Sequence, residues 1–226
     1  GEGFDDADLP RDVTDAVEDA ADRLAETGTA DTVTVDTDSG TVTLFIDGIA
    51  PQPELVVIGS GHDVGPVVEL GRRNGFRVTV VGFRGAVDLA GRFPEATETV
   101  TTAPADLTET LAIDDDTYAV VMTHNFVDDR IAVEQLLSTP VPYVGLMGPR
   151  ERFQELREAL AEGGTALTES DRGRLYTPVG LDLGGGSPYQ IATSIVGEAL
   201  AVHNERQPQH LTEREGPIHD RVDADT

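Results

Sequence analysis

The chain contains no cysteine, no lysine and no tryptophan, and only 5% of its 226 residues are aromatic. The lack of cysteine excludes disulfides, thiolate metal sites and a cysteine nucleophile. The lack of lysine excludes a P-loop lysine and catalysis through a Schiff base. With so few aromatic rings, we do not expect a surface on which nucleic-acid bases stack.

The chain is strongly acidic. It has 42 Asp and Glu residues against 16 basic residues, all of them arginine, and a formal net charge of −26. Such a surface repels DNA, RNA and anionic lipid, so we expect neither a nucleic-acid nor a membrane partner. An acidic surface that recruits a protein partner is one interpretation. We favour halophilic adaptation, because a very salty cytoplasm screens the self-repulsion of the chain.

No apolar run approaches the roughly 20 residues that a membrane-spanning helix needs. No basic segment leads into an apolar one, as a secretion signal requires. We therefore expect a cytoplasmic protein. The apolar content of 38% is sufficient for the core of one α/β domain with a small additional segment.

The first fifty residues differ in pattern from those that follow. Apolar residues at helical spacing predict a helix over 14–25, and alternating runs at 32–35 and 42–46 predict a β-hairpin. Pro51 and Pro53 indicate a stiff linker. We therefore divide the chain into a small helix and hairpin segment (1–50), a Rossmann-like domain (51–203) and a flexible tail (204–226).

The second segment has the pattern of an α/β fold. Leu55–Ile58 is a continuous apolar run, as expected of a strand that is buried on both faces of a parallel sheet. Strands alternating with helices predict βαβ units, and so a Rossmann-like parallel sheet with helices on both faces. The further predicted strands are 76–81, 98–101, 118–123 and 141–146, and the predicted helices are 66–74, 128–137, 150–162 and 188–203.

A glycine-rich loop, Gly59 to Gly65, connects the first of these strands to a helix. In such a loop Gly59 permits the tight turn, Gly61 lets backbone N–H groups approach a phosphate, and Gly65 permits close packing of helix on strand. The helix N-terminus also favours an anion there. We therefore predict a phosphate-binding loop, which the sequence context of strand and helix supports.

The end of the next strand has an arginine where dinucleotide-binding domains usually carry an acid. The segment reads Val80-Val81-Gly82-Phe83-Arg84. Arg84 could pair with a 2′-phosphate, as in NADP sites, or with a phosphate of another ligand; alternatively it is a solvated surface residue. NAD is therefore disfavoured relative to NADP or another phosphorylated ligand.

Two later loops have a similar form. The segment 145–150 follows a strand and enters a helix at Pro149. The segment 184–188 has the same pattern, with Ser187 as N-cap and Pro188 at the first helical position. Each is interpretable as plain helix capping, but together with the glycine loop they indicate a polyanionic ligand.

Histidine and carboxylate side chains accompany these loops. His62 and Asp63 lie in the glycine loop, His124 follows the strand ending at Thr123, and Asp182 lies in an apolar, glycine-flanked stretch. A histidine there could transfer a proton or hold a phosphate, or it could cap its own loop. No metal-ligand spacing such as His-x-x-x-His is present, so we expect no metal site. A Gly-x-Ser-x-Gly elbow is also absent.

Seven segments together resemble the C-terminal Rossmann domain of XdhC/CoxI-type proteins, the xanthine dehydrogenase accessory family. The segments are 53–62 (PELVVIGSGH), 75–81 (GFRVTVV), 92–96 (RFPEA), 117–124 (TYAVVMTH), 143–150 (YVGLMGPR), 178–184 (PVGLDLG) and 191–195 (IATSI). The resemblance implies a factor that binds molybdenum cofactor, a pterin phosphate that is often nucleotide-extended. It implies delivery of this cofactor to a molybdenum hydroxylase apoenzyme of the xanthine dehydrogenase or CO dehydrogenase type. A homodimer is also plausible on this basis.

The chain departs from the family pattern in three places. Gly82 replaces an acidic residue, and Gly148-Pro149-Arg150 replaces a Gly-Ser-Arg pattern. The family's N-terminal domain, with its cysteine-bearing segment, is largely missing, so a separate protein could supply it. The predicted cofactor-binding residues are Gly59, Ser60, Gly61, His62, Asp63, Gly65, Arg84, Thr123, His124, Gly145, Arg150 and Asp182.

We expect a cofactor-binding accessory protein rather than a catalyst. Two alternatives remain open. One is an NADP-dependent oxidoreductase, based on the glycine loop and Arg84. The other is a non-catalytic scaffold with a vestigial nucleotide pocket.

Overall fold

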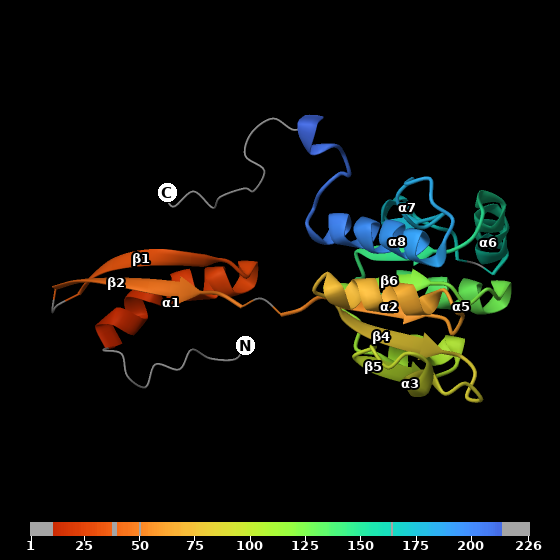
Figure 1. Cartoon of the computed structure of the whole chain (residues 1–226), viewed down its shortest axis with the longest axis horizontal. Helices are drawn as coiled ribbons and strands as arrows, with labels where there is room; N and C mark the ends of the chain where they lie inside the picture. The colour runs from red at the N-terminus through yellow and green to blue at the C-terminus, as the bar shows by residue number, and fades with distance from the viewer. Residues whose placement is uncertain (1–10, 38–39, 50, 164, 214–226) are drawn as a thin grey trace. The chain divides into compact units, whose positions relative to one another are not determined.

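The structure is a computed structural model, which describes residues 11–37, 40–49, 51–163 and 165–213. The chain forms two compact units, Gly1–Gln52 and Pro53–Thr226, each with its own contacts (Figure 1). The division falls at the proline-containing segment. Most of the predicted tail lies outside the described residues, so its flexibility stays a prediction.

The first unit is a helix against a β-hairpin, as predicted. Helix α1 (Arg11–Thr27) is followed by antiparallel strands β1 (Ala30–Thr37) and β2 (Gly40–Asp47). Burial alternates along both strands, because successive side chains of a strand point to opposite faces. The helix buries Val13, Val17 and Leu24. The apolar side chains of the helix and those on one face of the hairpin thus form one small core.

The second unit is built on a six-stranded parallel sheet with the order β5-β4-β3-β6-β7-β8. This is the strand order of the Rossmann fold, and it confirms the predicted fold class. The strands are β3 (Glu54–Ile58), β4 (Arg77–Gly82), β5 (Glu98–Thr101), β6 (Thr117–Val121), β7 (Tyr143–Leu146) and β8 (Leu175–Tyr176).

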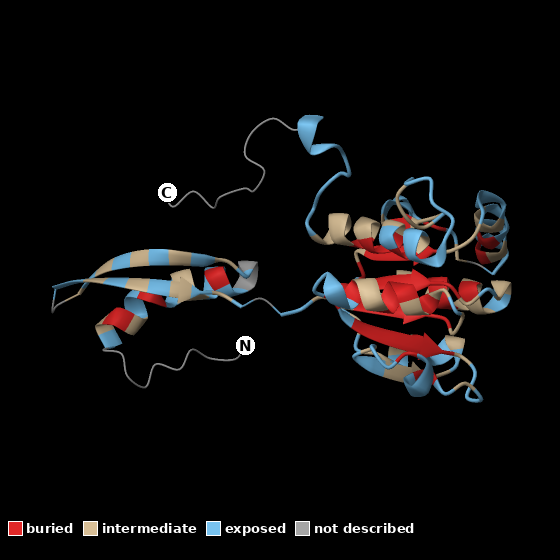
Figure 2. Ribbon diagram, in the orientation of Figure 1, coloured by how far each residue is buried: buried red, intermediate tan, exposed pale blue. Residues whose placement is uncertain are grey.

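Helices cover both faces of this sheet, and the side chains of β3 show why. Leu55 and Val57 belong to one apolar cluster and Val56 and Ile58 to the other, and all four are at most 2% exposed. Figure 2 shows the strands as a buried layer. The helices over the first face are α2 (Val64–Arg73), α3 (Leu89–Arg92) and α8 (Pro188–His203), and those over the second are α4 (Leu107–Thr110), α5 (Phe126–Leu137) and α6 (Arg150–Glu162).

Several short elements were not expected from the sequence. They are α3, α4, α7 (Glu169–Arg174), β8 and two 3-10 turns, Pro104–Asp106 and Leu211–Glu213. One expectation was wrong: the 184–188 loop does not directly follow a strand. Strand β8 pairs with β7 through Leu175 and Tyr176 only, and residues 177–187 form a loop that leads to α8.

Helix α8 ends with a turn that glycine usually makes. Glu205 has a φ of 52°, its N–H donates to Val202 O, and Arg206 N–H donates to Ala201 O. These two bonds form a Schellman motif, with Glu205 at the left-handed position. In the described part of the chain, every helix is too short or too polar to cross a lipid bilayer.

Candidate functional site

The candidate site is the crevice at the carboxyl ends of β3 and β6. These strands are parallel neighbours at the centre of the sheet, and the helices that follow them, α2 and α5, lie on opposite faces. The two loops therefore diverge, and the space between them is where open α/β sheets bind ligands. The glycine loop (Gly59–Asp63) forms one side, and the loop Thr123–Asn125 forms the other.

Close neighbours explain the first two glycines of the loop. The Gly59 N–H donates to Val81 O over 2.8 Å, and a Cβ at Gly59 would lie 2.5 Å from the Met122 carbonyl oxygen. A Cβ at Gly61 would lie 2.3 Å from Asp63 Oδ1 and 3.5 Å from His124 Nε2. The first glycine thus permits the turn against β6, and the second leaves room for the Asp63 carboxylate.

The predicted role of Gly65 in helix packing was wrong. A Cβ at Gly65 would meet nothing within 4 Å. The close packing of α2 on the sheet occurs two turns later, at Gly71, where a Cβ would lie 2.8 Å from Leu55 and 3.1 Å from Val78. Gly65 lies in the first turn of α2, where the backbone is open to an approaching group.

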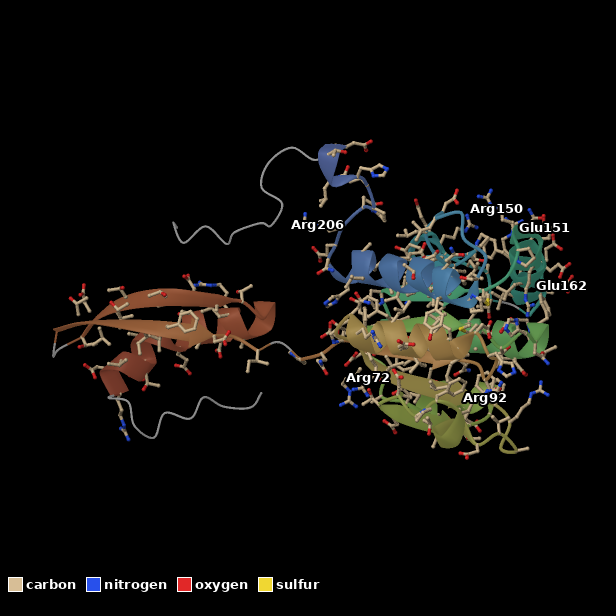
Figure 3. All side chains as sticks on the ribbon, viewed as in Figure 1. Arg72, Arg92, Arg150, Glu151, Glu162 and Arg206 are labelled. Atoms are coloured by element: carbon tan, nitrogen blue, oxygen red, sulfur yellow. The ribbon has the colours of Figure 1, made fainter. Side chains whose placement is uncertain are left out.

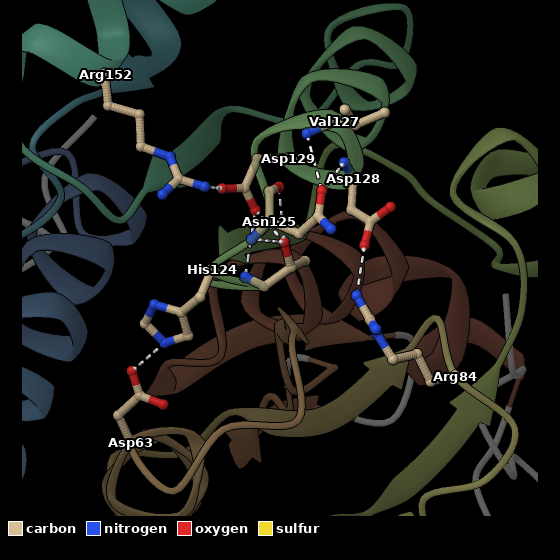
Figure 4. A network of polar contacts seen from close by, with 9 residues as sticks. Asp63, Arg84, His124, Asn125, Val127, Asp128, Asp129 and Arg152 are labelled. Atoms are coloured by element: carbon tan, nitrogen blue, oxygen red, sulfur yellow. Dashed lines mark hydrogen bonds and ion pairs between the residues drawn. The ribbon is translucent and has the colours of Figure 1, made fainter.

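Asp63 and His124 meet across the crevice. His124 Nε2 lies 2.8 Å from Asp63 Oδ2, as the dashed line in Figure 4 marks. His124 has a φ of 60°, which is rare for a residue other than glycine. Such backbone strain persists only where surrounding contacts hold it, and it is concentrated at functional sites. The histidine thus presents its ring toward the glycine loop.

A buried polar network holds the histidine loop in place. Asp129, 1% exposed, accepts hydrogen bonds from Thr123 N at 3.2 Å and from Thr123 Oγ1 at 2.5 Å. Its other carboxylate oxygen pairs with Arg152 of α6 (Figure 4). Asn125 caps α5 by accepting from Val127 N and Asp128 N. The network joins the loop after β6 to the first turn of α6.

Asp129 and Arg152 were not predicted from the sequence, although a signal was present. Asp129 precedes Ala132, Val133 and Leu136 at the spacing of one helix face, and all three are fully buried. A carboxylate at an apolar-face position requires a partner. The partner, Arg152, comes from another helix, so no local sequence pattern identifies it.

Arg84 pairs with an acid of the facing helix. Its Nη2 lies 3.7 Å from Asp128 Oδ2, and its side chain is 67% exposed. From the sequence, Arg84 was expected either to bind a phosphate or to be a solvated surface residue. The structure shows it in a surface ion pair. At the end of β4, the place of the usual acid is occupied by Gly82, against which Leu89 packs.

The helix N-termini at this edge differ in how they are capped. The N-termini of α5 and α8 are satisfied by Asn125 and by the Ser187 capping box, whereas α2 and α6 have no side-chain cap. The 184–188 loop is therefore explained by plain capping. In the first turn of α2 the Val64 N–H donates to Gly61 O and Pro66 has no N–H, which leaves the Gly65 N–H for an anion. In α6 the Arg152 N–H donates to Pro149 O, which leaves the N–H groups of Arg150 and Glu151.

Arg150 stands at the first position of α6, where the helix dipole disfavours a positive charge (Figure 3). It is exposed, and in the part of the chain that the structure describes no carboxylate forms an ion pair with it. An arginine beside an uncapped helix N-terminus favours binding of an anion.

Three predicted residues are not joined to this group. Gly145 is buried inside β7, where a Cβ would lie 2.4 Å from Val179, so its role is packing. His62 and Asp182 are exposed, and no hydrogen bond of the described residues links either side chain to the crevice. Ser60 and Thr123 do lie in the two loops, and Thr123 belongs to the Asp129 network.

The arrangement is suited to hold an anion rather than a metal. Uncapped N–H groups, the His124 ring and the Arg150 guanidinium are all donors. Among the described residues, no group of three His, Cys, Asp or Glu side chains is placed to bind a metal ion.

Comparison with known proteins agrees with the geometry. The model of the XdhC Rossmann domain matches residues 55–199. The chain belongs to this family. Its match spans β3 through most of α8 and includes the glycine loop, His124 and the Asp129 network.

Similar proteins share this part of the chain. The chain is 31% identical over 160 residues to a Bacillus subtilis protein described as a probable subunit of xanthine dehydrogenase, covering 71% of this chain and 46% of that protein. It is 31% identical over 183 residues to the Escherichia coli protein YqeB, covering 80% of this chain and 33% of that protein. The crystal structure of a xanthine dehydrogenase from Bacillus halodurans superposes with a TM-score of 0.61 at 28% identity, covering 76% of this chain and 48% of the other. The chain thus spans half or less of these relatives' length.

Proposed function

We propose that the chain binds a molybdopterin-type cofactor, or its dinucleotide form, and delivers it to a molybdenum hydroxylase apoenzyme. The xanthine dehydrogenase and CO dehydrogenase types are the candidate targets. The observation that carries the proposal is the convergence of the open glycine loop, the uncapped α2 N-terminus and the strained His124 at one crevice of an XdhC Rossmann domain.

The residues of the crevice fit a pterin phosphate. Its phosphate is anionic, and it would approach the backbone at Gly61 once the Asp63 carboxylate, which fills the space beside that glycine, turns away. The Gly65 N–H in the first turn of α2 and the His124 ring would bind that phosphate. Arg150 would bind a second phosphate of a dinucleotide form, at the N-terminus of α6. When bound, the cofactor supplies the redox chemistry of the target enzyme.

The chain's own residues then bind and orient the cofactor and do not transform it. Asp129 and Arg152 fix the Thr123–Asn125 loop, so the position of His124 is set before a ligand arrives. Handling of sulfur would need a thiol, and this chain has no cysteine.

A second candidate, an NADP-dependent oxidoreductase, is supported by the position of Arg84 after β4. Arg84 pairs with Asp128, and this carboxylate would repel a 2′-phosphate at the same place. The ion pair therefore favours the cofactor-delivery proposal. A scaffold with a vestigial pocket remains the third candidate, and it requires no ligand at all.

The test is a titration of the purified protein, in high salt, with molybdopterin cytosine dinucleotide, its guanine analogue, NAD and NADP. We expect binding of a pterin ligand that His124→Ala weakens about tenfold, as loss of a charged hydrogen bond predicts. The matched control is His210→Ala, which removes an exposed histidine outside the crevice and should leave affinity unchanged. Binding of NADP alone, lost in Arg84→Ala, would establish the second candidate. Absence of binding to all four would leave the scaffold.

A further inference from the structure

A second cavity, of about 490 Å³, lies beside the C-terminal half of α8. None of its lining residues belongs to the crevice. Its walls come from β8, from the loop before α8, from α8 itself and from the residues after it; those used below are Tyr176, Leu181, Glu198, Val202, Glu205 and Arg206. The volume falls in the range of roughly 300 to 1,000 Å³ that is usual for small-molecule pockets.

Glu198 is held in this cavity by two donors. Its Oε2 accepts from the Tyr143 hydroxyl at 2.9 Å and from Gly180 N at 2.8 Å. Tyr143 is fully buried, and Gly180 has a φ of 100° with Ser194 Oγ where a Cβ would stand. The chain therefore uses a buried phenol and a glycine-specific turn to fix one carboxylate oxygen.

The Glu198 carboxylate has no cationic partner in the described part of the chain. Its second oxygen, Oε1, accepts no hydrogen bond from the described residues. A half-buried carboxylate is stabilised by a counter-charge, because burial removes part of its hydration. Tyr143 and Gly180 hold one oxygen of Glu198, and the other oxygen is left to accept from a ligand. We therefore expect this ligand to carry a positive charge.

The other walls of the cavity suit a cation on an apolar body. The Tyr176 ring packs on Tyr143 with centroids 4.8 Å apart, and it also lines the cavity. Burial first, and the Glu198 carboxylate second, raise the pKa of the Tyr176 hydroxyl. The Glu205 carboxylate and the Arg206 guanidinium (labelled in Figure 3) also line the cavity, so carboxylates outnumber cations two to one.

We propose that this cavity binds a small organic cation, a primary ammonium on an apolar stem. Glu198 is its counter-ion, the Tyr176 ring contacts the charge or the stem, and Leu181 and Val202 cover the apolar part. Aromatic faces and carboxylates both recognise ammonium ions in proteins. The site is separate from the cofactor crevice and does not depend on the function proposed for it.

The experiment compares three probes that share a phenylethyl group on the full chain by calorimetry: 2-phenylethylamine, 2-phenylethanol and 3-phenylpropionate. We expect the amine to bind at least about tenfold more tightly than the alcohol, and the carboxylate to bind most weakly. Glu198→Gln retains an oxygen that accepts from Tyr143 and Gly180, so the fold should persist. It should lower the affinity for the amine about tenfold, to that of the alcohol.

Two further variants make the result specific. Glu151→Gln removes the same charge from the exposed surface of α6 and should leave amine binding unchanged. Val202→Trp fills the cavity one helical turn after Glu198 and should abolish amine binding. Equal binding of the three probes, or an amine affinity that is the same in Glu198→Gln and the native chain, would overturn the proposal. A parallel pterin titration of Glu198→Gln separates this outcome from a failure of the crevice.

Discussion

The carboxylate of Asp63 and the ring of His124 are joined across the crevice, with Oδ2 and Nε2 separated by 2.8 Å. Asp63 occupies the N-cap position of α2, yet its side chain makes no capping bond there. The carboxylate reaches over the opening instead, to a residue 61 positions later in the chain. An anion that binds to Nε2 of His124 must therefore displace a negative charge that already holds the ring.

Substitutions of Asp63 and of His124 should change ligand affinity in opposite directions. Asp63→Asn removes one negative charge beside the ligand phosphate, worth roughly 1 kcal/mol near a protein surface, so affinity should rise about fivefold. His124→Ala should lower it about tenfold. Calorimetric titration of both variants with a pterin ligand measures this. If Asp63→Asn weakens binding as much as His124→Ala, Asp63 contacts the ligand directly.

Substitution of Gly59 should mainly reduce stability, whereas substitution of Gly61 should mainly reduce ligand affinity. A Cβ at Gly59 would strike the Met122 backbone, so Gly59→Ala should lower the free energy of unfolding by about 1 to 3 kcal/mol. A Cβ at Gly61 would strike only the end of the Asp63 side chain, which can move. Gly61→Ala should cost less than about 1 kcal/mol and yet weaken ligand binding. Urea unfolding and ligand titration of both variants test the difference, and equal losses of stability would contradict it.

Asp129 should be among the most sensitive polar residues of the domain. Asp129→Ala leaves the buried part of Arg152 without its carboxylate, which typically costs about 3 to 5 kcal/mol. Asp128→Ala, one residue earlier, removes only a surface ion pair with Arg84 and should cost less than about 1 kcal/mol. Chemical denaturation of the pair measures the contrast. Similar denaturation midpoints for the two variants would show that the Asp129 network contributes little to the free energy of unfolding.

Glu205→Gly should stabilise the protein. Glu205 takes a left-handed conformation at the end of α8, which costs a non-glycine residue about 1 kcal/mol. Glycine makes the same turn without that strain. The control is Asn204→Gly, whose native φ of −85° gives glycine no advantage. Thermal unfolding should rank Glu205→Gly above the native chain and Asn204→Gly at or below it; the reverse order would remove the argument.

Stability should fall in alkali because of Tyr118. Burial, followed by the nearby carboxylates of Asp116, Glu205 and Asp115, raises the pKa of Tyr118 to about 12. In the unfolded chain the pKa is about 10, so the full stabilisation is present below pH 10. Between pH 10 and 12 the unfolded chain loses the proton first, and the free energy of unfolding falls. Urea denaturation at pH 9 and pH 11 should show a smaller fall for Tyr118→Phe. An identical fall in both proteins would assign the effect to other tyrosines.

Local sequence determined the helices and strands that carry their own signals. Helices Arg150–Glu162 and Pro188–His203 and strand Glu98–Thr101 have the bounds expected from apolar spacing and from start residues such as Ser187 and Pro188. The parallel sheet follows from strands that alternate with helices, and the glycine loop follows from its place between strand and helix. These features depend on residues a few positions apart, which a sequence displays directly.

Tertiary structure decided what depends on distant residues. No spacing along the chain shows that α2 packs closely at Gly71 rather than at Gly65, because the neighbours Leu55 and Val78 come from two strands. The same holds for the pairing of Asp63 with His124, of Arg84 with Asp128 and of Asp129 with Arg152. Leu175 and Tyr176 form a strand only because they pair with the edge of β7. The sequence places chemically active residues at the ends of strands, and folding determines which of them meet.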